Sequence, residues 1–98
     1  MWFGWIEFDL LLGDVHSLKQ KRAVVRPILS EIRRRFEVSV AETGGQDLHR
    51  RAGVAAGLVA ADAVHVIEVL DGIERLVAAR PEVQLLSARR RLDSSEDE

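Results

Sequence analysis

Alternating side chains at the start of the chain predict a β-strand over residues 2–12. Successive residues of a strand point to opposite faces, so the two sets of alternate positions form two distinct surfaces. One set is apolar throughout, whereas the other combines aromatic, aliphatic and acidic residues. The first set is Trp2, Gly4, Ile6, Phe8, Leu10 and Leu12, and the second is Phe3, Trp5, Glu7, Asp9 and Leu11.

Apolar residues spaced three to four apart predict an amphipathic helix over residues 17–36. Ser17 is a good N-cap, and Gln20 three residues later completes a capping box. Pro27 lacks the amide hydrogen that would bond to the carbonyl of Ala23, so we expect a kink there or two helical pieces. The apolar positions are Leu18, Val25, Ile28, Leu29, Ile32 and Phe36.

Two further strands are predicted in the middle of the chain. Residues 38–41 alternate as a short strand, and residues 43–47 are typical of a loop. A stretch rich in Ala, Val and Gly then runs from about Leu48 or Arg51 to Ala61. Because it lacks the polar spacing of a helix, we predict a strand there.

The C-terminal part of the chain predicts a second helix and a last strand. Asp62 is a suitable N-cap, and Arg80 followed by Pro81 is a typical helix end. Residues 83–92 then form the strand. The apolar stripe of this helix is expected to contain Val66, Ile67, Leu70, Ile73 and Val77.

The resulting order, β-α-β-β-α-β, is that of a ferredoxin-like α+β domain. Its two helices cover one face of a four-stranded antiparallel sheet and leave the other face open. Phe3, Trp5 and Leu11 would lie on the open face, and exposed apolar groups of this kind mark interfaces. We therefore expect a homo-oligomer, with a dimer favoured, that associates through sheet faces or an edge strand.

The composition is that of one small globular domain. The chain has 98 residues, of which 47% are hydrophobic and 31% charged. It has no cysteine, so disulfides and cysteine-based metal sites are excluded. No stretch resembles a secretion signal or a membrane-spanning helix, so we expect a cytoplasmic protein with no membrane partner.

Charge is unevenly distributed along the chain. The formal net charge is −2, but residues 93–98 contain four acids and no apolar residue. We expect these six residues to form a disordered acidic tail after a single domain of residues 1–92. Residues 19–35, in contrast, contain seven Lys or Arg and one acid, Glu31.

This basic helix is a candidate surface for RNA phosphates, because clustered cations bind the nucleic-acid backbone. The alternative is a solvated helix face with ordinary surface pairs. Stacking of RNA on the sheet is disfavoured, because residues 51–57 lack aromatics and Glu7 and Asp9 would repel phosphate. The candidate phosphate-binding residues are Lys19, Lys21, Arg22, Arg26, Arg33 and Arg34, with Arg35 beside them.

Two predicted loops carry a smaller group of polar residues. His16, Ser17, Asp47 and His49 form a candidate loop site for an anion. Their spacing is not that of a metal site, so we expect no metal and no cofactor. The chain also lacks an evident nucleophile with a paired base and a Gly-rich phosphate loop, so we expect no catalytic residues and no enzymatic activity.

Three blocks resemble the bacterial YlxP-like family of small proteins of undefined function. They are residues 16–22 (HSLKQKR), 34–42 (RRFEVSVAE) and 46–52 (QDLHRRA), in the family's order. The resemblance implies a ferredoxin-like fold and an intracellular bacterial protein. Family members are often encoded beside translation-initiation and ribosome-maturation factors, which implies an association with RNA or the ribosome. The family supplies no catalytic residues.

Together these observations predict a non-enzymatic, self-associating domain that assists RNA or ribosome processes through its basic helix. A second hypothesis is a structural or protein-binding oligomer that acts through its open sheet face. A third is a small-molecule-binding module with a site at a subunit interface.

Overall fold

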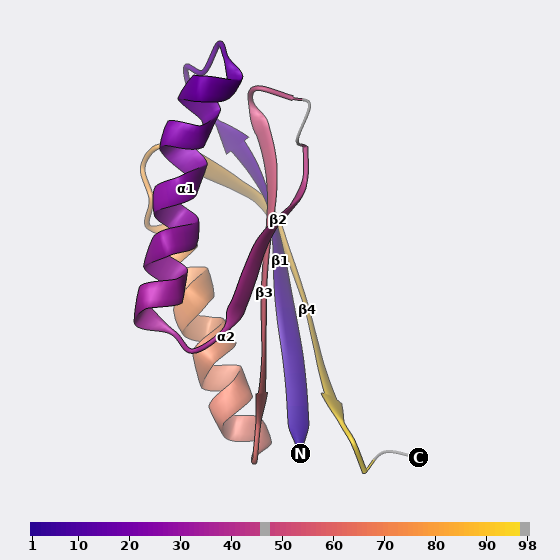
Figure 1. Cartoon of the computed structure of the whole chain (residues 1–98). Coiled ribbons are helices and arrows are strands. Elements are labelled where there is room, and N and C mark those ends of the chain that lie inside the picture. Colours follow the sequence, from indigo (N-terminus) through magenta and orange to yellow (C-terminus); the bar gives the residue numbers. More distant parts are fainter. Residues whose placement is uncertain (46–47, 97–98) are drawn as a thin grey trace.

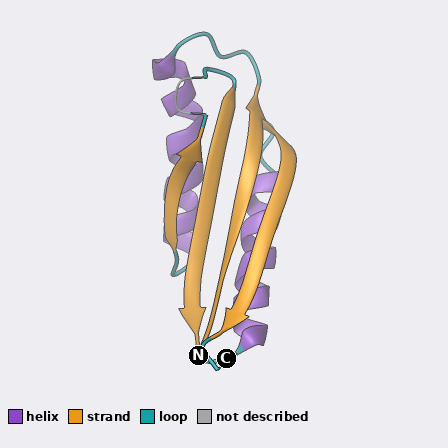
Figure 2. Cartoon of the chain, turned by 90° about the vertical axis from the view of Figure 1, so that its right-hand side faces the viewer, coloured by secondary structure: helices purple, strands orange, loops and turns teal. Residues whose placement is uncertain are grey.

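The computed structural model describes residues 1–45 and 48–96 and has the predicted β-α-β-β-α-β order. Figure 1 shows both helices on one side of the sheet, and Figure 2 shows the four strands side by side in front of them. The fold-class prediction is therefore confirmed. The elements are β1 (Trp2–Leu12), α1 (Leu18–Arg35), β2 (Ser39–Gly44), β3 (Arg51–Ala60), α2 (Ala63–Ala78) and β4 (Val83–Ser94).

The sheet has the order β2-β3-β1-β4, and every neighbouring pair of strands is antiparallel. β1 is therefore a central strand, paired with β3 on one side and β4 on the other. Trp5 lies opposite Gly57 of β3 and Arg91 of β4. Directly paired residues point to the same face, so this register assigns the strand residues to the helix-covered or the open face.

The core lies between the helices and the apolar side of β1. Ile6, Phe8, Leu10 and Leu12 are fully buried there, as the alternation predicts. α2 packs closely against β1 at Gly4, where a Cβ atom would lie 2.7 Å from Cγ1 of Val66. The helices contribute Val25, Ile28 and Ile32 from α1, and Val66, Leu70, Ile73, Leu76 and Val77 from α2.

Two residues predicted on the apolar helix faces lie outside the core. Leu18 is 43% exposed and Ile67 is 41% exposed. Leu18 lies in the first turn of α1, and Ile67 follows the buried Val66 on α2. The α2 stripe instead includes Leu76, which is buried.

The start of α1 has the predicted cap with one difference. Ser17 Oγ accepts a hydrogen bond from the Gln20 amide at 3.1 Å. The Gln20 side chain accepts from the amide of His16, at 2.6 Å, rather than from the amide of Ser17. α1 then continues through Pro27 as one helix, which excludes the second of the two predicted alternatives, two helical pieces. Val25 and Ile28, both buried, hold the turns on either side of Pro27 in the core.

β2 extends further than the sequence indicates. Thr43 and Gly44 belong to the strand rather than to the predicted loop: Gly44 pairs with β3, and Thr43 lies at the shift in register between Glu42 and Gly44. Gly44 lies opposite Gly53 after a shift in register, where a Cβ atom on Gly53 would lie 2.8 Å from the Gly44 nitrogen. Gln46 and Asp47 of the predicted loop lie outside the described residues.

β4 also extends further, into the predicted acidic tail. Asp93 and Ser94 pair with Phe3 and Trp2, because β1 begins early enough to offer them partners. The Ser95 amide then donates to the Met1 carbonyl at 3.0 Å. The prediction of a disordered tail is therefore wrong for residues 93–94, while residues 97–98 lie outside the described residues.

Candidate functional site

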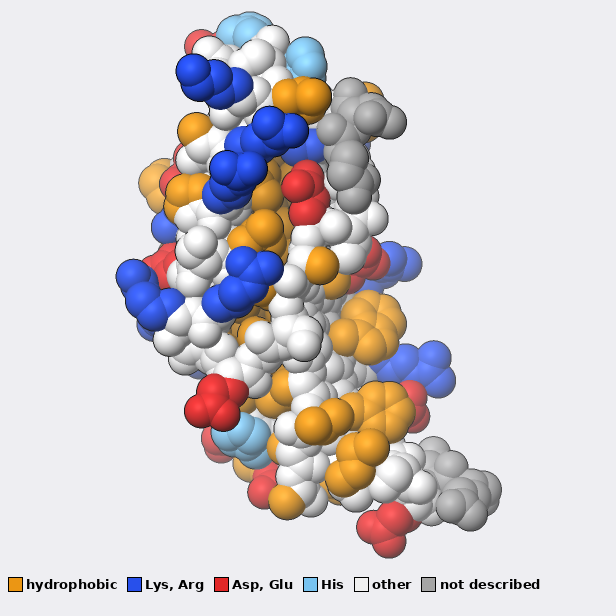
Figure 3. All heavy atoms as spheres, viewed as in Figure 1, with side chains coloured by type: hydrophobic (Ala, Val, Ile, Leu, Met, Phe, Trp, Pro, Cys, Tyr) orange, Lys and Arg blue, Asp and Glu red, His pale blue; other side chains and the backbone are white. Residues whose placement is uncertain are grey.

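The sheet face away from the helices, called the open face below, carries large apolar side chains. Phe3 is 37%, Trp5 39% and Val59 70% exposed, and Leu11 is half-buried. Phe3 and Val59 are directly opposed across β1 and β3. Figure 3 shows hydrophobic side chains gathered on the strand side of the lower half of the molecule. The three residues predicted as an oligomer interface thus share one face, but Leu11 is less accessible than the two aromatics.

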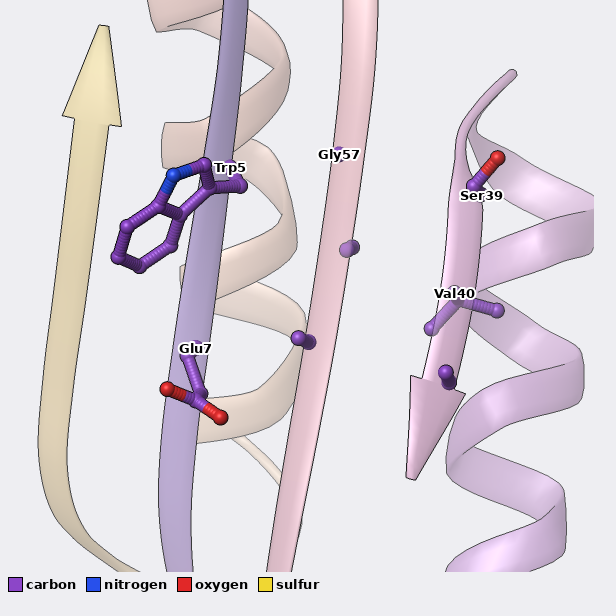
Figure 4. Close-up of a pocket in the computed structure, with 8 residues that line it drawn as sticks. Trp5, Glu7, Ser39, Val40 and Gly57 are labelled. Carbon is purple, nitrogen blue, oxygen red and sulfur yellow. The ribbon is translucent and has the colours of Figure 1, made fainter. Parts of the chain in front are cut away.

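A shallow depression of about 390 Å³ lies beside Trp5, and we call it the Trp5 hollow. Its floor consists of small residues, Ala41, Ala55 and Gly57, on two strands. In Figure 4 the indole ring leans from β1 towards β4, away from this floor. The complete lining is Trp5, Glu7, Ser39, Val40, Ala41, Ala55, Ala56 and Gly57.

Charged side chains beside the hollow are paired with each other across the strands. Glu7 accepts hydrogen bonds from Thr43 Oγ1 at 2.7 Å and from Arg89. The Thr43 hydrogen bond, and then that of Arg89, hold the pKa of Glu7 below its ordinary value of 4.5. Asp9 forms an ion pair with Arg51 in the same way. Three strands, β2, β1 and β4, are thus connected through Glu7.

These pairs leave the open face electrically balanced. Besides Glu7–Arg89 and Asp9–Arg51, Arg91 Nε lies 2.8 Å from Asp93 on β4. The register places all six side chains on the open face. Among the described strand residues, this face therefore carries three acids and three bases.

Lys21 of the basic helix is not at the surface. Its side chain is 4% exposed, and its ammonium group donates to the carbonyls of Gly45 and of Leu48, the latter at 2.9 Å. Glu42 Oε2 lies 3.3 Å from the same nitrogen. The prediction that Lys21 contacts phosphate is therefore wrong: it connects α1 to the β2–β3 connection.

The other basic residues of α1 fall into two groups. Arg33 donates to the Val40 carbonyl at 3.2 Å, and Arg34 and Arg35 lie 3.9 and 3.6 Å from Glu31. The second group is exposed and forms no ion pair within residues 1–45 and 48–96; we call it the α1 cation patch. It consists of Lys19, Arg22 and Arg26. Figure 3 shows Lys and Arg side chains following the α1 side of the molecule.

The candidate loop site is only partly brought together. His16 and His49 line the same open depression, and the ring of His16 pairs with Asp14. Ser17 is occupied as the N-cap, and Asp47 lies outside the described residues. In the part of the chain that the structure describes, no group of three metal-ligating side chains occurs.

Sequence reasoning missed the partners of the sheet-face acids, Thr43, Arg51 and Arg89. The run of arginines at residues 89–91 was the available signal. In a strand, such a run places Arg89 and Arg91 on one face and Arg90 on the other. Arg90 indeed contacts α2, with its guanidinium 2.8 Å from Asp71 and 2.9 Å from Glu74.

A four-stranded antiparallel sheet with two helices on one face defines a ferredoxin-like α+β domain. One solved structure with a similar fold is SnoaB, a cofactor-independent oxygenase from Streptomyces nogalater, as its N63A mutant. The TM-score is 0.51 over 99% of this chain and 95% of that chain. The sequence identity is 11%, so the similarity concerns the fold alone.

The family follows from the sequence comparisons. Residues 3–90 match the model of the family described as "Protein of unknown function (DUF503)", and this chain belongs to that family. It is 31% identical over 81 residues to "Uncharacterized protein YlxP" of Bacillus subtilis (strain 168), across 83% of this chain and 88% of that protein. The YlxP-like resemblance is thus confirmed. None of the described helices combines the length and apolar character of a membrane span.

We predict that Lys21→Met lowers the free energy of unfolding by about 2–3 kcal/mol, because two carbonyls and Glu42 lose their cationic partner. Urea denaturation measures this change. Lys19→Met, on the exposed side of the same turn, is the matched control and should alter stability by no more than about 0.5 kcal/mol. Equal stabilities of the two variants would show that the Lys21 contacts contribute little.

We predict that Glu7 makes stability sensitive to acid. Because folding lowers the pKa of Glu7, its contribution is present above pH 4.5 and is lost as the pH falls through the folded-state pKa. Glu7→Gln should therefore lose less unfolding free energy than the parent between about pH 6 and about pH 3. Glu37→Gln, an exposed carboxylate outside the sheet, should follow the parent; a Glu7→Gln curve parallel to the parent's contradicts the prediction.

Proposed function

We propose that this protein is a non-enzymatic binding domain that associates with a second copy of itself through the open face. The observation that carries the proposal is the exposure of Phe3, Trp5 and Val59 on one side of a central pair of strands. Large exposed apolar groups are unfavourable in water and are typical of interaction sites. Contact with an identical face removes them from solvent.

The charge balance of the open face supports a second copy as the partner. The pairs Glu7–Arg89 and Asp9–Arg51 neutralise their charges within each copy. Two such faces therefore meet without net repulsion, whereas two α1 cation patches would repel each other.

The state of the sheet-face acids supports a binding role over a catalytic one. A general base works best with a pKa near the working pH. The pKa of Glu7 is instead lowered by Thr43 and Arg89, and Asp9 is paired with Arg51. Both acids act as fixed partners that hold neighbouring strands in place.

We predict that the protein is a dimer and that Trp5→Glu shifts it to a monomer, because the change places an unpaired charge in the contact. Light scattering after size exclusion measures the mass. Val64→Glu is the matched control, since Val64 is 63% exposed on α2, and it should remain dimeric. A monomeric parent at every concentration, or a Trp5→Glu variant of unchanged mass, rules out the open-face contact.

A second function, contact with RNA phosphates, is favoured by the α1 cation patch. Lys19, Arg22 and Arg26 are spaced by three and four residues, so they share one side of α1. They are exposed and form no ion pair with the described residues, so their charge is available to a polyanion. This surface lies on the helix side, away from the open face.

We predict that replacing Lys19, Arg22 and Arg26 by Glu abolishes binding of ribosomal RNA while the dimer persists. Filter binding at rising salt should give the parent a log–log slope of roughly −2 to −3, as expected for about three phosphates. Replacing Arg34, Arg35 and Arg75 by Glu changes the net charge equally and is the control. If both triple variants lose binding alike, net charge rather than the patch is responsible.

A further inference from the structure

Trp5 and the Trp5 hollow are complementary features of one surface. Trp5 projects from β1 as a large exposed ring, and the floor beside it contains Ala41, Ala55 and Gly57. At Gly57 an added Cβ would lie 3.2 Å from the Gly4 carbonyl oxygen and 3.5 Å from Trp5 Cβ. A projecting ring next to a depression of this kind can fit the same pair of features on an identical copy.

We propose that Trp5 of each copy inserts into the Trp5 hollow of the other, an inference that rests on the proposed open-face dimer. Trp5 and Gly57 are directly opposed on the adjacent strands β1 and β3. A two-fold axis that runs parallel to the strands, between the two facing sheets and above the midline of β1 and β3, therefore brings Trp5 of one copy over Gly57 of its partner. Both insertions are equivalent, as a two-fold contact requires.

The lean of the indole ring agrees with this axis. In Figure 4 the ring extends from β1 towards β4, and the strands follow each other in the order β4, β1, β3, β2. The axis exchanges β1 with β3 and β4 with β2. A ring that leans towards β4 in its own copy thus leans towards β2 in the partner, where Ser39 and Ala41 form the outer floor of the hollow.

The neighbouring positions are compatible with the same axis. Phe3 is opposed to Val59, so Phe3 of one copy meets the partner's Val59 in an apolar contact. Glu7 is opposed to Ala55, and its charge stays satisfied by Thr43 and Arg89 of its own copy.

The area of the open face is also compatible with a dimer. Four strands that average about ten residues, at ~3.3 Å per residue and ~4.8 Å apart, give a flat face of about 600 Å². Projecting side chains increase this area towards the ~800 Å² per partner that standard interfaces bury.

Two variants test the insertion: one removes the indole ring, and the other places a larger side chain on the floor of the Trp5 hollow. Trp5→Ala removes the inserted ring and should weaken dimerisation at least about 30-fold, as for a central aromatic anchor. Ala55→Leu adds its extra atoms to the open face and should weaken dimerisation at least about tenfold by blocking the hollow. Ala23→Leu, which adds the same atoms on the exposed side of α1, should leave dimerisation unchanged. Sedimentation equilibrium measures all three.

Mixing the two weakened variants gives the decisive result. A heterodimer of Trp5→Ala and Ala55→Leu has one native insertion and one site where the missing ring makes room for the added leucine. The heterodimer should therefore dissociate less readily than either homodimer. Native mass spectrometry of the mixture measures the proportions of the three dimers. Ala41→Leu repeats the test at a second floor position, and circular dichroism confirms that each variant is folded.

The results of these experiments distinguish the insertion of Trp5 from the open-face dimer on which it rests. Preferential heterodimers support the reciprocal insertion. A parent dimer that Trp5→Glu dissociates, but that Ala55→Leu and Ala41→Leu leave intact, overturns the insertion while the open-face contact stands. A mixture without preferential heterodimers overturns it as well. A monomeric parent overturns both the insertion and the proposed dimer.

Discussion

Two helices cover only one face of a four-stranded sheet, and β1 has apolar residues on both of its faces. Ile6, Phe8 and Leu10 are buried beneath α1 and α2, whereas no helix or strand of the described residues covers Phe3 and Trp5. This unequal cover explains both the position of the core and the chemistry of the open face. There, small residues and paired charges surround the exposed rings.

The charges of the molecule follow the same division. On the open face, acids and bases neutralise each other across strands, as in the Glu7–Arg89 pair. On the helix side, Lys19, Arg22 and Arg26 stay exposed and unpaired among the described residues. The two surfaces lie on opposite sides of the domain. A dimer joined through its open faces would therefore direct both α1 cation patches outwards, and self-association and polyanion binding would not compete.

Much of the fold was predictable from local patterns, because alternation and helical spacing are properties of adjacent residues. The caps at Ser17 and Asp62 formed as predicted, since they need only residues three positions away. The ends of the strands were predicted less well. β2 and β4 continue to Gly44 and Ser94 because β3 and β1 offer pairing partners there. Where a strand ends depends on the strand that pairs with it, which is distant in sequence, so local composition does not determine the end.

For the candidate site, the sequence by itself determined which residues share a face: it placed Phe3 and Trp5 together with Glu7 and Asp9, and it located the basic helix. Only the tertiary structure decided what each of these residues contacts. Lys21 lies in line with the buried Val25, yet its removal from the surface follows from carbonyl groups more than twenty residues away. Thr43 and Arg89 meet at Glu7 because strands distant in sequence pair side by side. Side-chain direction is a local property of the backbone, whereas ion pairs, hollows and burial require segments that only folding brings together.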